Sequence, residues 1–399
     1  MGRGGFAILL LLFAAGCASS SRSLRSLDAE RACWPTFPYR GGWLGGDGAY
    51  SVPLGDGRSL WLFGDTFVGA PGAGDRSAAK FIHNSIGVST CHPDGRFDVE
   101  YFWGRSDDGT PRAILDRNQA SQWWWLDGGF VREGRLYLGL LEVESAPAHG
   151  TLALPFRVTG TAIAEVRDFE RDPRAWQPRV LPLSHDAGAF PLAAQVVHGD
   201  HLYLFGFLDR PDGRPRFLTR IPLAAFDAAS PDLPAAIETL GAGGRWLPGL
   251  QPDAAQILMD DDATEMSVAF HAADGRWLAL YSYPDVAASF PKTRPSDAVW
   301  ARTASALEGP WSAPQLVFRI PELAPGRGDP NTGCYAAKEQ PAFSRPGSAT
   351  FTYVCNLFTG PHENPFAVLR RLQTQMELYR PVPVTVSLPD SPKAAEAAR

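Results

Sequence analysis

Hydrophobic positions recur along the chain in five similar pairs of short segments. Each pair joins an apolar segment, a turn that contains glycine and a second apolar segment rich in aromatic residues, which is the pattern of a β-hairpin. The turn glycines are 65 to 77 residues apart, so the sequence predicts repeated units. The pairs are GDGAYSVPLGDGRSLWLFGD, LDGGFVREGRLYLGLLE, AAQVVHGDHLYLFGF, EMSVAFHAADGRWLALYS and EQPAFSRPGSATFTYVCN, with turns at Gly57, Gly134, Gly199, Gly275 and Gly347.

Segments between the hairpins also have strand-like alternation or β-branching and are expected to supply outer strands. A hairpin with an outer pair makes a four-stranded antiparallel blade. We therefore predict an all-β fold over residues 33–388, a five-bladed β-propeller of four-stranded antiparallel blades. A β-sandwich or two separate β-domains would not produce five equivalent hairpins. The outer segments are FIHNSIGVST, RVTGTAIAEV, RFLTRIPLAAF and AVWARTASAL.

The composition agrees with this fold and limits the partners. Aromatic residues make up 11% of the chain, with 12 Trp, 40 Gly and 35 Pro, and the net charge is -6. Abundant Gly, Pro and aromatic residues favour strands and turns over long helices. The mild acidity offers no basic footprint for nucleic acid, so we expect a neutral or small partner.

The first residues have the features of a bacterial lipoprotein export signal. The apolar run FAILLLLFAA and small residues precede Cys17, and the run is too short to span a bilayer. We predict a signal peptide at 1–16, lipid on Cys17 holding the chain to the membrane, a tether at 17–32 and a loose tail at 389–399. An ordinary cleaved secretory signal is the alternative. The absence of an acidic residue at position 18 favours, by resemblance to Gram-negative sorting, the outer membrane of the cell envelope.

The other four cysteines are an even number in an exported chain, which favours disulfides. Three connectivities can join four cysteines, and we expect Cys334 to pair locally with Cys355. The absence of C-x-x-C spacing argues against a zinc site, so no metal ligands are predicted.

Carboxylates are expected to converge at one end of the propeller channel. Asp65 follows the apolar run LWLF and should lie beside Asp47, where the same hairpin begins. Paired carboxylates in a concave site can hydrolyse a glycosidic bond, because one protonates the leaving oxygen while the other acts as nucleophile or base. Counting back from each turn gives Asp47, Asp127, Gln195, Glu265 and Glu339 as the residues that begin the first strands.

We therefore predict four catalytic candidates and a set of substrate-binding residues. Asp127, in LDGG, is assigned to substrate binding, although capping a turn is an equal alternative; Glu339 has the alternative of pairing with a cation. Tandem tryptophans cannot all face one core from an extended strand, and a flat ring can stack on a sugar. The catalytic candidates are Asp47, Asp65, Glu265 and Glu339, and the binding candidates from these patterns are Asp127, Trp124, Trp125 and Tyr335.

The segment from Gly45 to Ser89, which contains GGDGAYSVPLGDGRSLWLFGDTF and HNSIGVS, resembles a family of secreted bacterial propellers. That family is known largely as a domain of unknown function, and its kin include endo-D-arabinanases. The resemblance implies that Asp47 and Asp65 are catalytic or substrate-binding acids, with His83 and Asn84 as a polar pair nearby. It also admits a calcium ion in the channel; no other cofactor is expected.

Other chemistries lack their motifs: H-E-x-x-H, G-x-S-x-G and G-x-x-x-x-G-K-[ST] do not occur, which argues against metalloproteases, esterases and P-loop enzymes. Two hypotheses remain. The first is a surface-anchored glycoside hydrolase that cuts a furanosidic, arabinan-like or related envelope glycan. The alternative is a carbohydrate-binding propeller without catalysis, and a structural scaffold of the envelope is a third option.

Overall fold

The structure is a computed structural model that describes residues 33–149, 154–185, 188–210, 213–260, 263, 265–283, 297–359 and 363–388. The predicted signal peptide, Cys17, the tether and the C-terminal tail lie outside these residues. Within the described part of the chain, no helix is long and apolar enough to cross a membrane.

Five antiparallel sheets of three to five strands follow one another along the chain. The first sheet joins β2 (Tyr50–Gly55), β3 (Arg58–Phe63), β6 (Ser85–Cys91) and β7 (Phe97–Phe102), and the second joins β10 (Gln122–Arg132), β11 (Arg135–His149), β12 (Leu154–Val166) and β13 (Arg179–Ser184). The third joins β14 (Ala189–His198), β15 (His201–Leu208), β16 (Arg216–Pro222), β17 (Glu238–Gly241) and β18 (Arg245–Pro248). The fourth joins β19 (Ser267–His271), β20 (Arg276–Ser282), β21 (Ala298–Ala304) and β22 (Gln315–Arg319), and the fifth joins β23 (Thr332–Glu339), β24 (Ser348–Leu357) and β25 (Val382–Ser387).

These sheets confirm the all-β prediction and the five hairpins. Each predicted hairpin forms the first two strands of a sheet, and the predicted outer segments supply the third strands β6, β12, β16 and β21. All five turn glycines have positive φ, between 55° and 76°, a conformation that glycine adopts without strain. The uniform four-stranded pattern holds for three sheets only, because the third sheet has five strands and the fifth has three.

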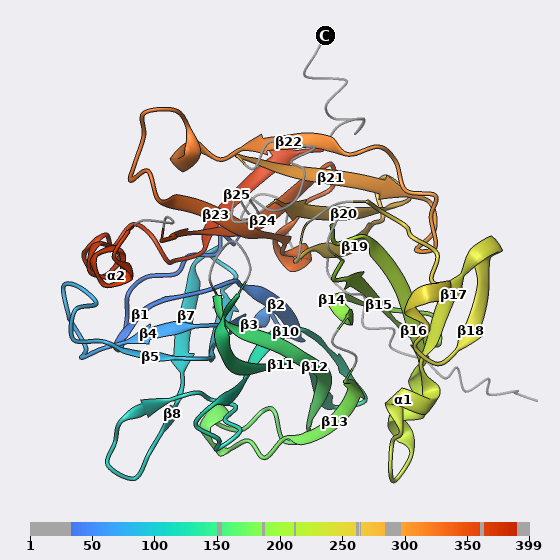
Figure 1. Ribbon diagram of the computed structural model, residues 1–399, viewed down its shortest axis with the longest axis horizontal. Helices are drawn as coiled ribbons and strands as arrows, with labels where there is room; N and C mark the ends of the chain where they lie inside the picture. Colours follow the sequence, from blue (N-terminus) through green and yellow to red (C-terminus); the bar gives the residue numbers. More distant parts are fainter. Residues whose placement is uncertain are drawn as a thin grey trace, which may run out of the picture.

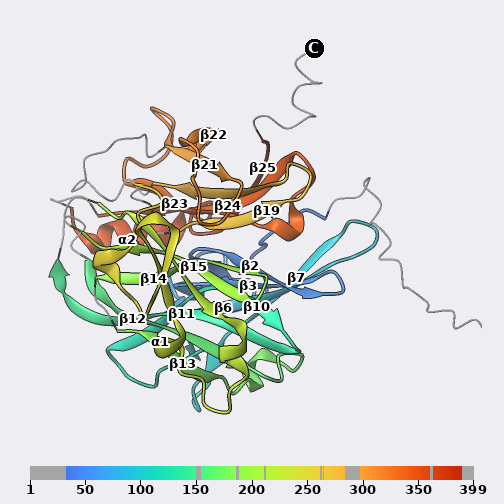
Figure 2. The ribbon, with the colours of Figure 1, turned by 90° about the vertical axis from the view of Figure 1, so that its right-hand side faces the viewer.

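The first strands of successive sheets lie side by side. Contacts join β2 to β10, β10 to β14, β14 to β19 and β19 to β23. Gln340, which follows β23, returns to the first sheet by accepting from the backbone N–H of Ser51 and donating to the backbone oxygen of Ala49. Outer strands such as β13, β18 and β22 lie at the periphery (Figure 1), and Figure 2 shows the same sheets from the side.

The apolar run before Asp65 is explained by burial on both faces of its sheet. Leu60 and Leu62 pack in a cluster with the second sheet, whereas Trp61 and Phe63 pack in a cluster with Phe37 and other aromatic residues. A strand covered on both faces is continuously hydrophobic instead of alternating. The run therefore ends where the strand reaches the end of the sheet.

Smaller elements surround the five sheets. A three-stranded sheet joins β1 (Trp43–Gly46), β4 (Thr66–Val68) and β5 (Lys80–Ile82), and a two-stranded sheet joins β8 (Gly104–Arg105) and β9 (Pro111–Arg112). The α-helices are α1 (Leu233–Ala236) and α2 (Pro365–Thr374). Short 3-10 helices cover Pro173–Ala175, Leu223–Asp227, Ala242–Gly244, Pro252–Ala254, Pro321–Leu323 and Pro341–Phe343.

The described residues form two disulfides, one within the fifth sheet and one that holds the N-terminal segment. Cys334 and Cys355 are register partners on β23 and β24 and are bonded to each other, which confirms the predicted local pair. Cys33 is bonded to Cys91 at the end of β6 and holds the N-terminal segment against the first sheet. Such cross-links stabilise the fold chiefly by restricting the unfolded chain.

Candidate functional site

The site is built around the loop that precedes β2. The backbone N–H of Asp47 donates to the backbone oxygen of Asp65 at 2.8 Å, and Gly64 N donates to the oxygen of Asp47 at 2.8 Å. The predicted proximity of Asp47 and Asp65 is thus confirmed. It arises because the second strand of the hairpin returns to the level at which the first begins.

Glu265 reaches the same point from the segment before β19. Its Oε1 accepts from Lys338 Nζ at 2.6 Å and from the Tyr50 hydroxyl at 3.3 Å. Lys338, on β23, is 1% exposed, and its ammonium lies 3.8 Å from the centroid of the Tyr50 ring. Gly48 lies beside this pair with φ 61°, and a Cβ there would be 3.5 Å from Lys338 Nζ. The absence of a side chain at Gly48 therefore leaves room for the ion pair between buried Lys338 and partly exposed Glu265.

Asp47 carries a carboxyl group that retains a proton near neutrality. Burial raises its pKa to about 7, helped by the negative charges of Glu265 and Asp65, against the opposing effects of the Tyr335 hydroxyl and Lys338. The Tyr335 side chain makes a hydrogen bond with Asp47, so Tyr335 lies beside this carboxyl group. A carboxyl group in such surroundings can serve as a proton donor.

Asp127 lies within β10, close to Tyr50, Lys338 and Glu265. It is 2% exposed, and burial raises its pKa to about 7 against the positive charge of Lys338, while Glu265 raises it further and Tyr50 hydrogen-bonds to it. Its Oδ1 has no hydrogen-bond partner among the described residues. Asp127 is therefore a second carboxyl group that holds a proton in the same charge cluster.

Asp65 anchors an aromatic wall on one side of the site. Its Oδ1 lies 2.9 Å from Trp125 Nε1 and 3.1 Å from His83 Nδ1. The His83 ring is stacked on Trp123, with centroids 4.2 Å apart and planes 12° apart, and Phe156 packs edge-on against Trp125. Trp123 and Trp125 face the same side because alternate residues of a strand share a face. All of these rings are partly exposed.

Three of the sequence candidates lie away from this wall and its carboxylates. Glu339 is the last residue of β23, not the first; it is 1% exposed and pairs with His271 at 3.0 Å. Trp124 faces the other side of β10 and packs in the cluster between the first two sheets, with Arg117 over its ring. Asn84 is buried and hydrogen-bonds to backbone atoms of Leu115 and Trp124, so it ties the loop at Leu115 to strand β10.

Glu339 was predicted to begin its strand by counting residues back from the turn glycine, and the structure shows that this count was wrong. The turn of the fifth hairpin contains a 3-10 helix, Pro341–Phe343, so β23 ends eight residues before Gly347. The first strands of the second and third sheets are also longer than predicted, and Asp127 and Gln195 lie inside β10 and β14. Only Asp47 and Glu265 precede the strands of their hairpins.

Sequence reasoning missed Lys338 and Trp123. Lys338 had a signal, because a lysine between alanine and glutamate in an otherwise apolar strand needs a buried partner. Trp123 was not separated from its neighbours because the face of β10 that each tryptophan occupies depends on the strand register.

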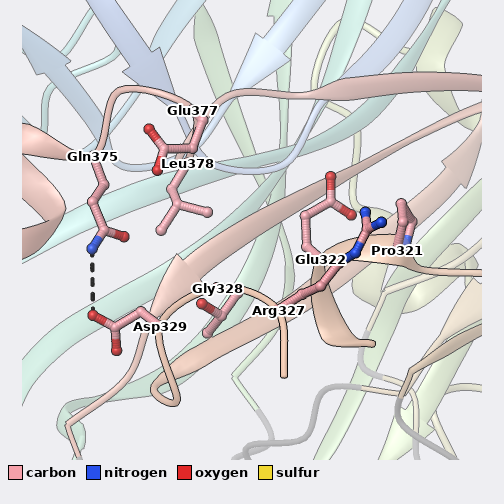
Figure 3. A pocket seen from close by; sticks show the side chains of 9 residues that line it. Pro321, Glu322, Arg327, Gly328, Asp329, Gln375, Glu377 and Leu378 are labelled. Atoms are coloured by element: carbon pink, nitrogen blue, oxygen red, sulfur yellow. Dashed lines mark hydrogen bonds between the residues drawn. The ribbon is translucent and has the colours of Figure 1, made fainter. Parts of the chain in front are cut away.

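A separate surface cavity of about 570 Å³ lies at the edge of the fifth sheet and contains none of the predicted site residues. Gln375 donates to Asp329 across part of it, and Glu322 and Arg327 lie on the opposite side (Figure 3). Within the described residues, the ligand-type atoms grouped closely enough for a metal ion belong to Glu322, Cys334 and Cys355. The disulfide occupies both sulfur atoms, so this group does not fit a metal.

The fold is similar to that of known proteins at low sequence identity. A candidate hydrolase from Bacteroides ovatus matches with a TM-score of 0.60 and 16% identity over 87% of each chain. An α-L-arabinofuranosidase from Podospora anserina, solved with cellotriose, matches with a TM-score of 0.44 and 11% identity, over 90% of this chain and 95% of that one. A GH43_1 enzyme from Xanthomonas citri, complexed with xylose, matches with a TM-score of 0.45 and 13% identity, over 90% and 92%. These similarities concern the fold.

No curated protein matches the sequence. One family model matches residues 36–387, which include all five described sheets and every carboxylate of the site. The chain therefore belongs to the family of proteins that share the domain of unknown function DUF5005.

Proposed function

We propose that this protein is a glycoside hydrolase whose reacting carboxyl groups are Asp47 and Glu265. The observation that carries the proposal is the difference between these two neighbours. Asp47 has a pKa of about 7 and holds a proton, whereas Glu265 is paired with the Lys338 ammonium at 2.6 Å. Glycosidic cleavage requires this combination of a protonated and an ionised carboxyl group.

In the proposed reaction, Asp47 donates its proton to the leaving oxygen, and ionised Glu265 acts as the nucleophile or activates water. Asp127 is a second protonated carboxyl group beside this pair, and it hydrogen-bonds to Tyr50. Asp65 orients His83 and Trp125 through its Oδ1. It therefore acts through the aromatic wall, although its sequence position suggested catalysis.

The proposed substrate is a neutral, furanosidic glycan of the arabinan type. Asp47 and Asp127 hold protons and the Lys338 ammonium is already paired with Glu265, so these groups offer no unpaired positive charge to a substrate that carries uronate, phosphate or sulfate. The partly exposed Trp125 and the His83–Trp123 stack offer flat surfaces for sugar rings, as aromatic side chains do in general.

The setting proposed for this activity is a five-bladed propeller held at the bacterial envelope. The side-by-side first strands and the return of Gln340 to the first sheet support five blades around one centre. The small residues before Cys17 support a lipid anchor, with the outer membrane as the proposed location. Both remain proposals beside the family assignment.

The test is release of reducing sugar from arabinans, other neutral glycans and a uronate polymer by the purified protein, Asp47→Asn and Glu265→Gln. Glu377→Gln is the matched control, because Glu377 is an exposed carboxylate at the separate cavity. We expect a neutral glycan to be cut by the wild type and the control only, and azide to restore cleavage in one of the two site variants.

A wild type that binds a neutral glycan but releases nothing would favour the carbohydrate-binding alternative. Equal activity of both site variants and the wild type would show that the pair is wrongly chosen.

A further inference from the structure

Glu265 is held by donors that converge on one of its two oxygens. Lys338 Nζ and the Tyr50 hydroxyl both donate to Oε1, at 2.6 and 3.3 Å. No described residue donates to Oε2, and the side chain is 27% exposed. A carboxylate with one oxygen fixed and the other presented to solvent is oriented for reaction.

The two donors are themselves fixed in place. Lys338 is 1% exposed, its ammonium lies 3.8 Å from the centroid of the Tyr50 ring, and its backbone oxygen accepts from Gln340 Nε2. A buried ammonium is costly unless it is paired and hydrogen-bonded. The chain keeps this cation on an inner strand, where a smaller apolar residue would pack without that cost.

Other charged groups interact with Lys338 or with the acids beside it. Asp47, before β2, and Asp127, on β10, both feel its positive charge, which opposes the burial of their carboxyl groups. Asp65 acts on Asp47, and Arg216 of β16 acts on Asp127. Tyr50 and Tyr335 are neutral hydroxyl partners, because burial raises the pKa of each well above its ordinary value.

We propose that Lys338 and Tyr50 are positioning residues that clamp Oε1 of Glu265 and thereby aim its Oε2 at the substrate. Lys338 also balances the charge of the surrounding acids, so that they can lie together without an external cation. The role of the clamp in turnover rests on the proposed function; its effect on the carboxyl groups does not.

The experiment compares Lys338→Met, which keeps the unbranched stem, with Lys338→Arg, which keeps the charge, and with Tyr50→Phe, which loses only the hydroxyl. Carbon-13 NMR of protein labelled at the aspartate carboxyl carbons follows the titration of Asp47 and Asp127 without any glycan. Variants Asp47→Asn and Asp127→Asn assign the signals.

We expect Lys338→Met to raise both aspartate midpoints by roughly one unit or more, because a nearby opposite charge lowers a carboxyl pKa by that much. Lys338→Arg should leave both near the wild-type values, whereas Tyr50→Phe should leave only the Asp47 midpoint there and should raise that of Asp127, which loses the Tyr50 hydrogen bond. Unchanged midpoints in Lys338→Met would overturn the charge-balancing role. If that variant does not fold, the same comparison is made between Glu265→Gln and Lys338→Met/Glu265→Gln, in which no carboxylate loses its partner.

Kinetic measurements on the glycan that the wild type cleaves then test whether Lys338 and Tyr50 orient the Glu265 carboxylate toward the substrate. We expect Lys338→Met to lower kcat about a hundredfold and Tyr50→Phe about tenfold, with KM within about threefold, because misplaced reacting groups reduce turnover more than binding. Lys338→Arg should recover part of the loss. Loss confined to KM would overturn the clamp. If the wild type cleaves no glycan, the proposed function fails, and the titration alone decides the role of Lys338.

Discussion

Two carboxylates that looked equivalent along the chain, Glu265 and Glu339, have different surroundings in the structure. Glu265 is partly exposed and shares Lys338 with two aspartates, Asp47 and Asp127. Glu339 directly follows Lys338 in β23 but lies on the opposite face of the strand, where it is buried, His271 pairs with it and Ser344 donates to it at 2.6 Å. A carboxylate fully satisfied by its own protein is structural, whereas one crowded by like charges beside solvent is available for chemistry.

The largest expected difference between the two is in catalysis. Glu265→Gln should lower kcat/KM about a thousandfold, in the range that removal of an acid or base produces. Glu339→Gln should stay within about tenfold of the wild type, because it touches none of the reacting groups. Initial rates on the cleaved glycan, at a temperature where both variants are folded, provide the measurement. Similar losses in both variants would remove the distinction.

Stability should show the reverse order. Glu339→Ala should lower the free energy of unfolding by about 3 kcal/mol, because it leaves His271 and Ser344 without their buried partner. Urea unfolding at neutral pH measures this change. Ser344→Ala is the milder control, since it removes two hydrogen bonds, the one to Glu339 and the one from the backbone N–H of Thr350, and should cost about 2 kcal/mol. A Glu339→Ala variant as stable as the wild type would contradict a structural role for the pair.

The raised pKa of Asp47 should make the free energy of unfolding depend on pH, which separates the crowded site from the buried Glu339 pair. Its pKa is about 7 in the folded protein and about 4 in an unfolded chain, so the native state binds more protons between those values. The free energy of unfolding then falls as pH rises from about 4 to 7. Asp47→Asn should be more stable than the wild type by about 2 kcal/mol at pH 8, allowing for the lost Tyr335 and Lys338 contacts. The gain should vanish near pH 4; a gain that is independent of pH would be evidence against the raised pKa.

The smallest effect is expected at His271. Burial disfavours its charge, but the hydrogen bond and charge of Glu339 outweigh that and raise its pKa. A raised histidine pKa contributes stability that is present below pH 6.5 and is lost as pH rises through the folded value. His271→Gln should therefore flatten the unfolding free energy in that window, which lies above the one for Asp47. An unchanged pH profile would mean that His271 is neutral beside Glu339.

The comparison also shows how far the sequence could predict the site. Asp47 and Asp65 were found because both lie at the ends of one hairpin, where local pairing fixes their distance. Glu265 was found because it also precedes a strand. Glu339 was misassigned because the number of residues between a turn and a strand end varies with turn structure, as the 3-10 helix at Pro341–Phe343 illustrates.

The sequence by itself determined the five hairpins, the positive-φ turn glycines and the local disulfide between Cys334 and Cys355, since each depends on neighbours along the chain or on one strand pair. Only the tertiary structure decided which acids share a cation and which face each tryptophan takes. Lys338 meets Glu265 across 73 residues, and such encounters depend on how separate sheets pack and on strand register, which local patterns do not specify.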